Sequence, residues 1–316
     1  MRGVKDSSTE VLEETGHYHI YHAEADVLSG NLKRPIEQKI EQQVPVSLKD
    51  RRGGHLTRVT EDFSLEGFIS FKRGLTRVSG SPSVKHPGWV TLSTSILEGL
   101  NVFEVMTADR VVSQVSTNHA YDNGHVPAVT FLGTQFTNLQ LGGFPLNPIL
   151  NLGVCGEKPD CDRPYVTDAQ FLGAVSNQVK SLAKMPGLPE ILQEKYDKTL
   201  TNIDKLTSNG SGNDYEEAIS VTCSLVHSID ISKIPIPGLK AVGNLLMIPD
   251  FGTVALAEIE VGIELDNDPE SRRSTDPGYS RMSNYFQLTM LNMQLGCIGH
   301  GTVNVGTTKT NGNTAP

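Results

Sequence analysis

Apolar and polar side chains alternate along much of the chain, and this two-residue rhythm predicts β-strands with one buried face and one wet face. In residues 36–49 the even positions are mostly apolar and the odd positions are mostly polar or charged. The same rhythm recurs in three further segments, 63–71, 219–231 and 257–266. In the last of these, Glu258, Glu260 and Glu264 all occupy even positions, so we expect them on a wet strand face.

A second kind of strand is indicated where both faces carry apolar residues, in segments 102–115, 126–139 and 285–295. The region 168–202 breaks the rhythm, because its apolar residues recur every third or fourth position on either side of a PGLP sequence at 186–189. This spacing predicts two helices separated by a turn. Thr167, with Gln170 three residues later, is the expected N-terminal cap of the first helix.

These elements predict a mainly β fold, either a two-sheet sandwich or a distorted barrel, with an inserted helix pair. We expect the helices to cover an open end or an open edge of a sheet. Residues 208–214 are rich in Gly and Ser, which predicts a flexible linker, and the last residues are polar, which predicts a disordered tail. The expected parts are a flexible N-terminus at 1–15, a β region at 16–166, a helical insert at 167–207, a linker at 208–214, a β region at 215–306 that completes the same fold or forms a second β domain, and a disordered tail at 307–316.

Several segments carry a resemblance to known proteins: 86–92 (HPGWVTL), 105–112 (VMTADRVV) and 248–254 (IPDFGTV). They resemble uncharacterised β-rich bacterial proteins, and the TADR strand at 107–110 is similar to the choice-of-anchor P group of bacterial surface proteins. The resemblance implies an exported or surface-associated β protein and brings no catalytic residues with it. The hydrophobic C-terminal anchor that defines the group does not follow Gly306.

The charge balance bears on the class of partner. The net charge is −9, from 36 acidic and 27 basic residues, which disfavours general binding to nucleic acid. The chain contains no run of about 18 apolar residues, so no membrane span is expected. Residues 1–15 lack the basic-then-apolar pattern of a signal peptide. The chain as written therefore predicts a cytoplasmic protein, or a secreted or surface-associated one if a signal peptide has been removed.

Two of the cysteines are candidates for a disulfide bond. Cys155 and Cys161 lie six positions apart in a segment that contains glycine and proline, and a local disulfide between them can form in an oxidising compartment. The spacing does not match a zinc knuckle or a redox pair. Cys223 lies among apolar residues and is expected to be a small buried side chain.

Histidines supply the candidate metal ligands. On one strand, His17 and His19 would point to the same face about 6.5–7 Å apart, a spacing that suits one divalent metal ion such as Zn²⁺. A third ligand would come from His119 or His125, which flank a predicted hairpin turn, or from an acidic residue. The alternative interpretation is that these are ordinary surface or half-buried histidines.

Acidic residues offer two further hypotheses. The loop 266–270, together with Glu264, provides oxygen ligands for Ca²⁺, although it lacks the full spacing of a helix–loop–helix calcium site. The row of Glu258, Glu260 and Glu264 resembles the paired carboxylates of glycoside hydrolysis. A solvated loop and a solvated strand face are the alternative interpretations.

The favoured function is a non-catalytic β protein that binds a protein or glycan partner, or that assembles with itself. Trp89 and Tyr121 are candidate ligand-contacting aromatic residues. No cofactor is expected, and a divalent metal, Zn²⁺ or Ca²⁺, is the alternative. Two enzyme hypotheses remain beside it: a metal-dependent enzyme with a His17/His19 site, and a glycoside-active enzyme that uses the Glu258 row.

Overall fold

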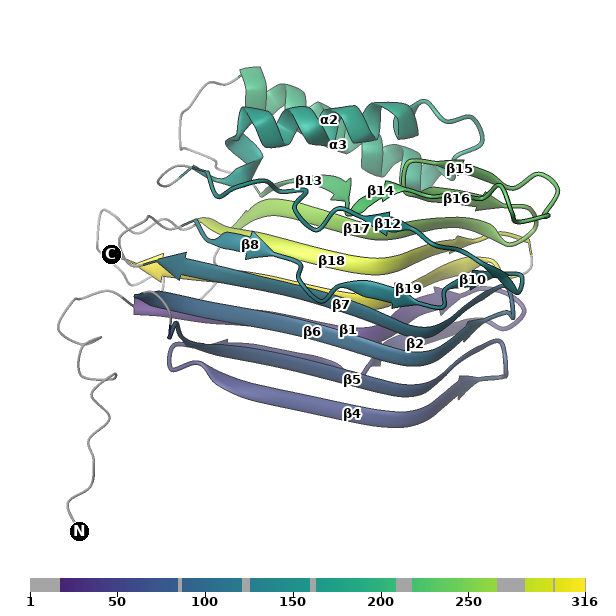
Figure 1. The fold of residues 1–316 in the computed structure, drawn as a ribbon, viewed down its shortest axis with the longest axis horizontal. Helices are drawn as coiled ribbons and strands as arrows, with labels where there is room; N and C mark the ends of the chain where they lie inside the picture. Colours follow the sequence, from purple (N-terminus) through teal and green to yellow (C-terminus); the bar gives the residue numbers. More distant parts are fainter. Residues whose placement is uncertain are drawn as a thin grey trace, which may run out of the picture.

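The computed structural model describes residues 18–84, 87–120, 126–159, 163–208, 218–265, 282–297 and 299–315. These residues form two large antiparallel sheets packed face to face, with a pair of helices along one end of the sandwich (Figure 1). The expected mainly β sandwich with an inserted helix pair is confirmed, and the two sheets do not close into a barrel.

Among the described residues, the first sheet has nine strands. In spatial order they are β15 (Lys240–Val242), β16 (Leu245–Ile248), β17 (Gly252–Leu265), β18 (Met282–Leu295), β19 (Gly301–Ala315), β1 (Tyr18–Leu32) and β2 (Gln38–Gln43), with β13 (Ile219–Ser224) paired to β17 and β3 (Val46–Asp50) paired to β1. Strands from before and after the helices therefore share this sheet, so the later β region completes the same fold.

The second sheet has eight strands among the described residues. They are β11 (Phe144–Pro145), β10 (Gln140–Leu141), β7 (Met106–Ala120), β6 (Gly88–Val102), β5 (Ile69–Pro82) and β4 (Gly54–Leu65), with β8 (Ala128–Thr130) and β9 (Gln135–Thr137) paired to β7. The remaining elements are a small ladder of β12 (Ile149–Leu150) and β14 (Val226–Ser228), the short 3₁₀ helix η1 (Tyr165–Thr167), and helices α2 (Ala169–Ala183) and α3 (Glu190–Ser208). None of the described helices is both long enough and apolar enough to cross a bilayer.

Two of the predicted strands differ from the structure at a turn or a break. The segment 36–49 is divided into β2 and β3 by Val44, whose φ is 56°, and Pro45, although the alternation of buried and exposed positions is kept. The segment 63–71 is the hairpin between β4 and β5, in which Phe63 pairs with Phe71 and their rings stack 5.1 Å apart. The prediction of one strand there was wrong because the tight turn preserves the two-residue rhythm.

The disordered tail expected at 307–316 is also wrong, because residues up to Ala315 belong to β19. This strand lies between β1 and β18 in the middle of its sheet. Its inward-facing Thr308 and Thr310 are fully buried, and the hydroxyl of Thr308 lies 2.7 Å from that of Ser113 on the opposite sheet. Threonine is a β-branched strand former, so a polar segment rich in it can fill an inner strand. The expectations for residues 1–15 and 209–214 lie outside the described residues.

The helix pair begins at a different cap from the one predicted. The side chain of Asp168 accepts a hydrogen bond from the Phe171 amide at 2.7 Å, whereas the hydroxyl of Thr167 donates to the Pro164 carbonyl. Asp168 is among the best N-cap residues, so it displaces the predicted threonine.

Both helices cover the edge of β13 that faces away from β17. Three of their side chains bond the β13 backbone: Gln178 accepts from the Ser224 amide and donates to its carbonyl, Thr199 accepts from the Thr222 amide, and Asn202 donates to the Ser220 carbonyl. These bonds take the place of a neighbouring strand, so the structure agrees with the expectation that the helices cover an open edge.

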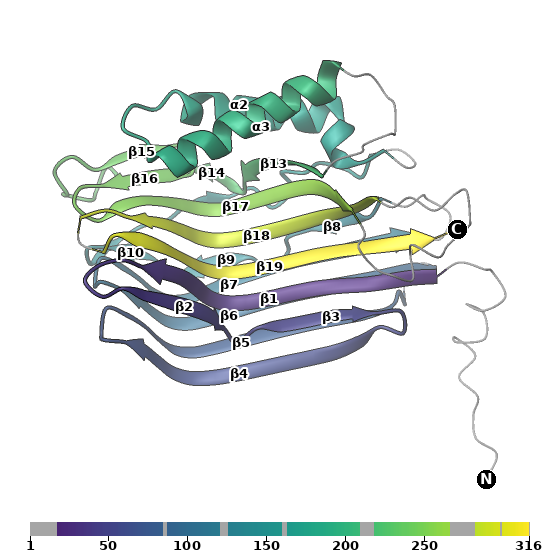
Figure 2. The same ribbon diagram turned by 180° about the vertical axis from the view of Figure 1, so that it is seen from behind.

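Both sheets bend along one line, which we call the crease. In the nine-stranded sheet it crosses Val27, Gly306, Met290 and Ala257, and in the other sheet it crosses Asp62, Lys72, Gly99 and Asp109. Ala257, Gly306, Asp62 and Gly99 have φ between 46° and 67°. Leu28 faces the core whereas Asp26, only two positions away, faces outward, so the inward and outward positions exchange at the crease. Figures 1 and 2 show the strands of both sheets bending together.

Candidate functional site

The outer face of the nine-stranded sheet carries a groove of about 780 Å³, which we call the polar groove. Figure 2 shows this face from behind, with β17, β18, β19 and β1 side by side and α3 above them. The four strands form its floor. Lys195 on α3 lies at one side, and Gln42, Pro45 and Ser47 of the β2–β3 segment lie at the other, with Arg58 of β4.

Strand pairing arranges the floor of the polar groove in rows. Residues paired across antiparallel strands point to the same face, with neighbouring strands about 4.7–4.9 Å apart. Three rows run from β1 across β19 and β18 toward β17: Glu24–Lys309–Gln287–Glu260, Asp26–Thr307–Thr289–Glu258 and Ser29–Asn304–Asn292. The result is a rigid surface of amide, hydroxyl, carboxylate and ammonium groups.

Glu258 differs from its prediction as a residue on a wet face, because only 4% of it is exposed. Its two carboxylate oxygens accept hydrogen bonds from the ammonium of Lys195 and the hydroxyl of Tyr196, each at 2.9 Å. Burial raises the pKa of Tyr196, and the neighbouring Glu258 raises it further. The sequence rhythm placed Glu258 on the correct side of the strand, but it contained no sign that α3 covers this position.

The other two glutamates of the row are half-buried and also bonded. The hydroxyl of Tyr285 donates to Glu260 at 2.6 Å, and the ammonium of Lys309 lies 2.8 Å from one carboxylate oxygen of Glu264. The same ammonium lies 4.6 Å from the centre of the Tyr285 ring. Burial raises the pKa of Tyr285, and Glu260 raises it further. The expected wet row is therefore a set of partnered carboxylates at the polar groove and beside it.

Asp26 is the groove residue that sequence reasoning missed. It is 5% exposed, and its Oδ2 accepts one long hydrogen bond of 3.4 Å from the Gln42 amide. Its Oδ1 has no hydrogen-bond partner among the described residues. Burial raises the pKa of Asp26 to about 7; the Gln42 bond opposes this rise and the charge of Glu24 adds to it. The available signal was a carboxyl group between Ala25 and Val27, on a strand that is otherwise apolar around it.

A break in strand pairing explains the position of Asp26. On this side of β1, pairing with β2 stops at Leu28 and pairing with β3 begins at Ala25. The chain between β2 and β3 turns away there, at Val44. The Asp26 carbonyl accepts instead a hydrogen bond of 2.8 Å from the Ser95 hydroxyl on the opposite sheet. The backbone is thus satisfied while the carboxyl group faces the polar groove.

Glu24, two positions earlier on the same strand, has a pKa that is displaced in the opposite direction, downward. One of its carboxylate oxygens lies 2.8 Å from Nε2 of His22, and this hydrogen bond lowers the pKa of Glu24. Its side chain is 47% exposed. The polar groove therefore holds two neighbouring carboxyl groups with pKa values displaced in opposite directions.

Two of the candidate histidines meet between the sheets, away from the polar groove. The rings of His19 and His119 lie 4.5 Å apart, and Trp89 stacks on His19 at 5.2 Å. All three side chains are buried, and burial lowers the pKa of His19 well below its usual value, with the nearby His119 as a second cause. The two imidazole rings pack with Trp89 and Tyr21 in a small aromatic core at this end.

The metal hypothesis stays a prediction. His17, Tyr121, His125 and the acidic loop 266–270 lie outside the described residues. Among the residues that the structure does describe, no three or more His, Cys, Asp or Glu side chains are grouped so that they could hold a metal ion.

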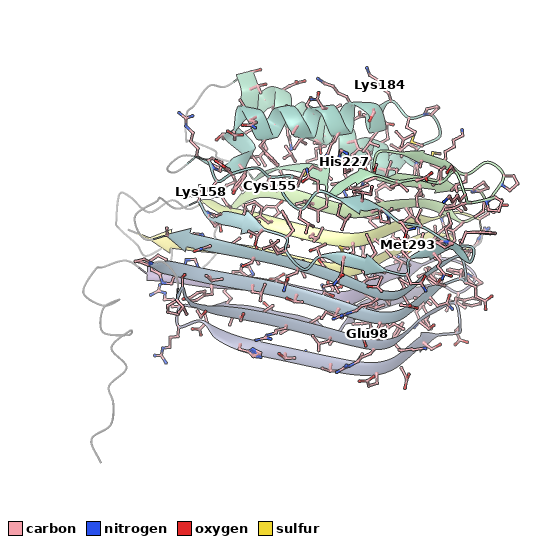
Figure 3. The ribbon with its side chains drawn as sticks, in the orientation of Figure 1. Glu98, Cys155, Lys158, Lys184, His227 and Met293 are labelled. Carbon is pink, nitrogen blue, oxygen red and sulfur yellow. The ribbon has the colours of Figure 1, made fainter. Side chains whose placement is uncertain are left out.

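Cys155, labelled in Figure 3, is a buried free thiol in the main hydrophobic cluster. Cys161, its candidate disulfide partner, lies outside the described residues. Burial raises the pKa of Cys155 well above its usual value, and the nearby Cys223 contributes. Cys223 is buried as expected, and burial raises its pKa to about 12.

The comparisons with known proteins identify a family and no function. A family described as "Domain of unknown function (DUF8256)" matches residues 19–262, which include β1, the helix pair and most of β17. No curated protein and no solved structure matches the chain. Because the family match covers well over half of the sequence, the chain belongs to the family Domain of unknown function (DUF8256).

Proposed function

We propose that this protein is a non-catalytic glycan-binding protein and that its ligand lies in the polar groove. The observation that carries the proposal is the density of amide and hydroxyl groups on the floor, held in rows by paired strands: Ser29, Gln287, Thr289, Asn292, Asn304 and Thr307. Side-chain amides both donate and accept hydrogen bonds, as the hydroxyl groups of a sugar also do. Strands hold these groups more rigidly than loops, which favours a defined ligand.

The charges at the groove favour an uncharged ligand. The ammonium of Lys195 is bonded to Glu258, and that of Lys309 is bonded to Glu264. Most of the positive charge is therefore already neutralised, and the described lining residues form no cluster of free cations that would select phosphate or sulfate.

The setting of this function rests on sequence resemblance alone. The similarity of segment 107–110 to choice-of-anchor P surface proteins favours a bacterial, surface-associated location, where glycans are accessible. The family match gives no link to that group. Binding to a protein partner, assembly through the outer edge of β4, and metal-dependent chemistry at His17 and His19 remain predictions.

Isothermal titration calorimetry with uncharged hexose oligosaccharides (cello-, malto- and mannohexaose) tests the proposal. The double variant Asn292→Ala/Asn304→Ala removes two groove amides, and at about 0.5–1.5 kcal/mol for each lost bond we expect roughly tenfold weaker binding. Gln135→Ala, at an exposed position of β9 in the other sheet, is the matched control and should bind like the wild type. Binding that is equally strong in the double variant would contradict the groove as the site.

A glycoside-active enzyme is the second candidate, because the pKa values of the neighbouring groove carboxyl groups Asp26 and Glu24 are displaced in opposite directions, although the predicted glutamate row is less suited to catalysis. Glu258, Glu260 and Glu264 are each bonded to a neighbouring side chain, which leaves them poorly placed as free acids or bases. Incubation of the same oligosaccharides with the protein, followed by chromatography of the products, separates the two functions. Shortened oligosaccharides would replace the binding proposal with the enzymatic one.

A further inference from the structure

We propose that Asp26 is the anchoring group of the polar groove, and that its carboxylate binds hydroxyl groups of the ligand while its proton passes to solvent. This inference rests on the proposed glycan-binding function and names the residue that forms the central contact. It also predicts a property that the groove amides alone would not produce, a release of protons on binding.

The hydrogen bonding of Asp26 is incomplete in the protein by itself. A buried carboxylate is stable only when several donors surround its two oxygens. Asp26 has one long bond of 3.4 Å from Gln42 at Oδ2, and Oδ1 has no partner in the described part of the chain. Two adjacent hydroxyl groups of a sugar ring would supply two short charge-assisted hydrogen bonds to such a carboxylate.

The contact that holds Asp26 to the opposite sheet does not involve its carboxyl group. The contact that ties this position to the opposite sheet, from Ser95, is made by the Asp26 backbone carbonyl, which any residue would provide. Only 5% of the residue is exposed, yet it lines the polar groove. Burial of a poorly bonded acid opposes folding, so its presence at a groove points to a role in binding.

Burial, with the charge of Glu24 as a smaller cause, favours the protonated form of Asp26 while the groove is empty. The other titratable and charged groups of the groove come from five elements: Glu24 on β1, Lys309 on β19, Arg58 on β4, Glu258 and Glu260 on β17, and Lys195 on α3. The β2–β3 segment contributes the uncharged Gln42 and Ser47. Lys195 and Lys309 are engaged by glutamates, and the charge of Glu24 acts against ionisation of Asp26.

The proton balance of the proposed step is simple. The free protein holds Asp26 as a carboxylic acid, the ligand donates two O–H hydrogen bonds to the carboxylate, and one proton leaves to buffer. No covalent bond to the ligand forms or breaks. Binding should therefore weaken by about tenfold for each pH unit below 7 and become independent of pH above about 8.

Calorimetry measures this proton directly. The tightest-binding hexaose is titrated at pH 6.0 into full-length protein, in phosphate and in imidazole buffer, whose ionisation enthalpies differ. We expect the observed enthalpy to reveal about one released proton per ligand at this pH and fewer at pH 8. Asp26→Asn cannot release a proton, so its binding should be weaker and independent of pH.

Controls separate this inference from the proposed function. Glu61→Gln removes an exposed carboxylate of β4 that pairs with Arg73 outside the groove, and it should keep the proton release of the wild type. Oligosaccharide binding without proton release, with Asp26→Asn as tight as the wild type, would overturn the role of Asp26 and leave the groove as the binding site. Absence of binding by the wild type at every pH would overturn both.

Discussion

At the scale of single residues, β1 carries two buried ionisable side chains whose effects on stability run in opposite directions with pH. Asp26 titrates with a raised pKa at the polar groove, and His19 titrates with a lowered pKa between the sheets. Each group binds protons differently in the folded and unfolded chain, so each contributes to the pH dependence of the free energy of unfolding.

For Asp26 the folded chain keeps the proton longer than the unfolded chain. The pKa is about 7 in the folded state and 3.8 in the reference state, so the stabilisation is present below pH 3.8 and is lost as the pH rises toward 7. Asp26→Asn removes this loss and should raise the free energy of unfolding at pH 8, relative to pH 4, by on the order of 2–4 kcal/mol. Urea unfolding at both pH values measures it, with Glu61→Gln as the control. An unchanged difference would show that Asp26 is not buried as an acid.

For His19 the sign is reversed, because burial favours the neutral ring. The unfolded chain takes up a proton below pH 6.5 while the folded chain does not, so stability is lost as the pH falls below that value. His19→Phe keeps an aromatic ring against Trp89 and should reduce the loss of stability between pH 7 and pH 5. Thermal unfolding at the two pH values is the measurement. His55→Gln, at an exposed position, should behave like the wild type, and so would His19→Phe if the ring were solvated.

Sequence reasoning found only part of this residue-scale picture. It named His119 as one possible third metal ligand beside His19, and the structure brings these two rings together in a buried aromatic core. It missed the role of Asp26, which faces a gap between β2 and β3, and it misjudged the exposure of Glu258, which α3 covers. The surroundings of both side chains depend on these neighbouring segments. Such covering segments are distant in sequence and leave no periodic signal.

At the scale of elements, the helix pair contributes buried apolar side chains such as Val175 and Leu192 to the main hydrophobic cluster, and polar side chains add specific hydrogen bonds to the sheet. Tyr196 and Lys195 of α3 bond Glu258, while Gln178 and Asn202 bond the edge of β13. The spacing of apolar residues was sufficient to predict both helices, because a 3.6-residue period is a local property. The side on which they pack could not be predicted, since it depends on apolar contacts and hydrogen bonds with segments distant in the sequence.

Tyr196→Phe removes one donor from a buried carboxylate without changing the shape of the ring. The loss should lower the free energy of unfolding by about 1–3 kcal/mol. Urea unfolding at pH 7 measures the effect, with Lys205→Ala at an exposed site of the same helix as the matched control. Equal stability of the two variants would mean that the Tyr196 hydroxyl does not hold α3 to β17.

Asn202→Ala uncovers part of the β13 edge. It removes the donor to the Ser220 carbonyl, and we expect about 1 kcal/mol of destabilisation together with increased association at high concentration. Light scattering across a concentration series, beside Lys205→Ala, detects the association. Variant and control that scatter alike would show that the edge is protected by other means.

At the scale of the whole molecule, the last strand is a central one. The polar composition of residues 307–315 indicated a loose tail, but β19 joins β1 to β18, and so connects the first and the later parts of the chain in one sheet. The overall sandwich was predictable because alternation dominates the sequence. The order of strands was not, because pairing between ends of the chain leaves no trace in local periodicity.

Substitution of Thr310 tests the central position of β19. Thr310→Asp places an unpaired charge at a fully buried site and should lower the free energy of unfolding by about 3 kcal/mol or more. Thr302→Asp, at a partly exposed site of the same strand, should cost much less. Circular dichroism during thermal unfolding compares them, and equal effects would place Thr310 outside the core.

The crease also constrains how this architecture can vary. The inward-facing and outward-facing positions exchange at the crease on each of the neighbouring strands. Residues paired across these strands therefore face the same side only while each strand keeps its length on both sides of the crease. A deletion at Gly306 alone would turn half of β19 inside out relative to β1 and β18. We expect relatives that gain or lose a residue at the crease of one strand to gain or lose a residue at the crease of the adjoining strands as well.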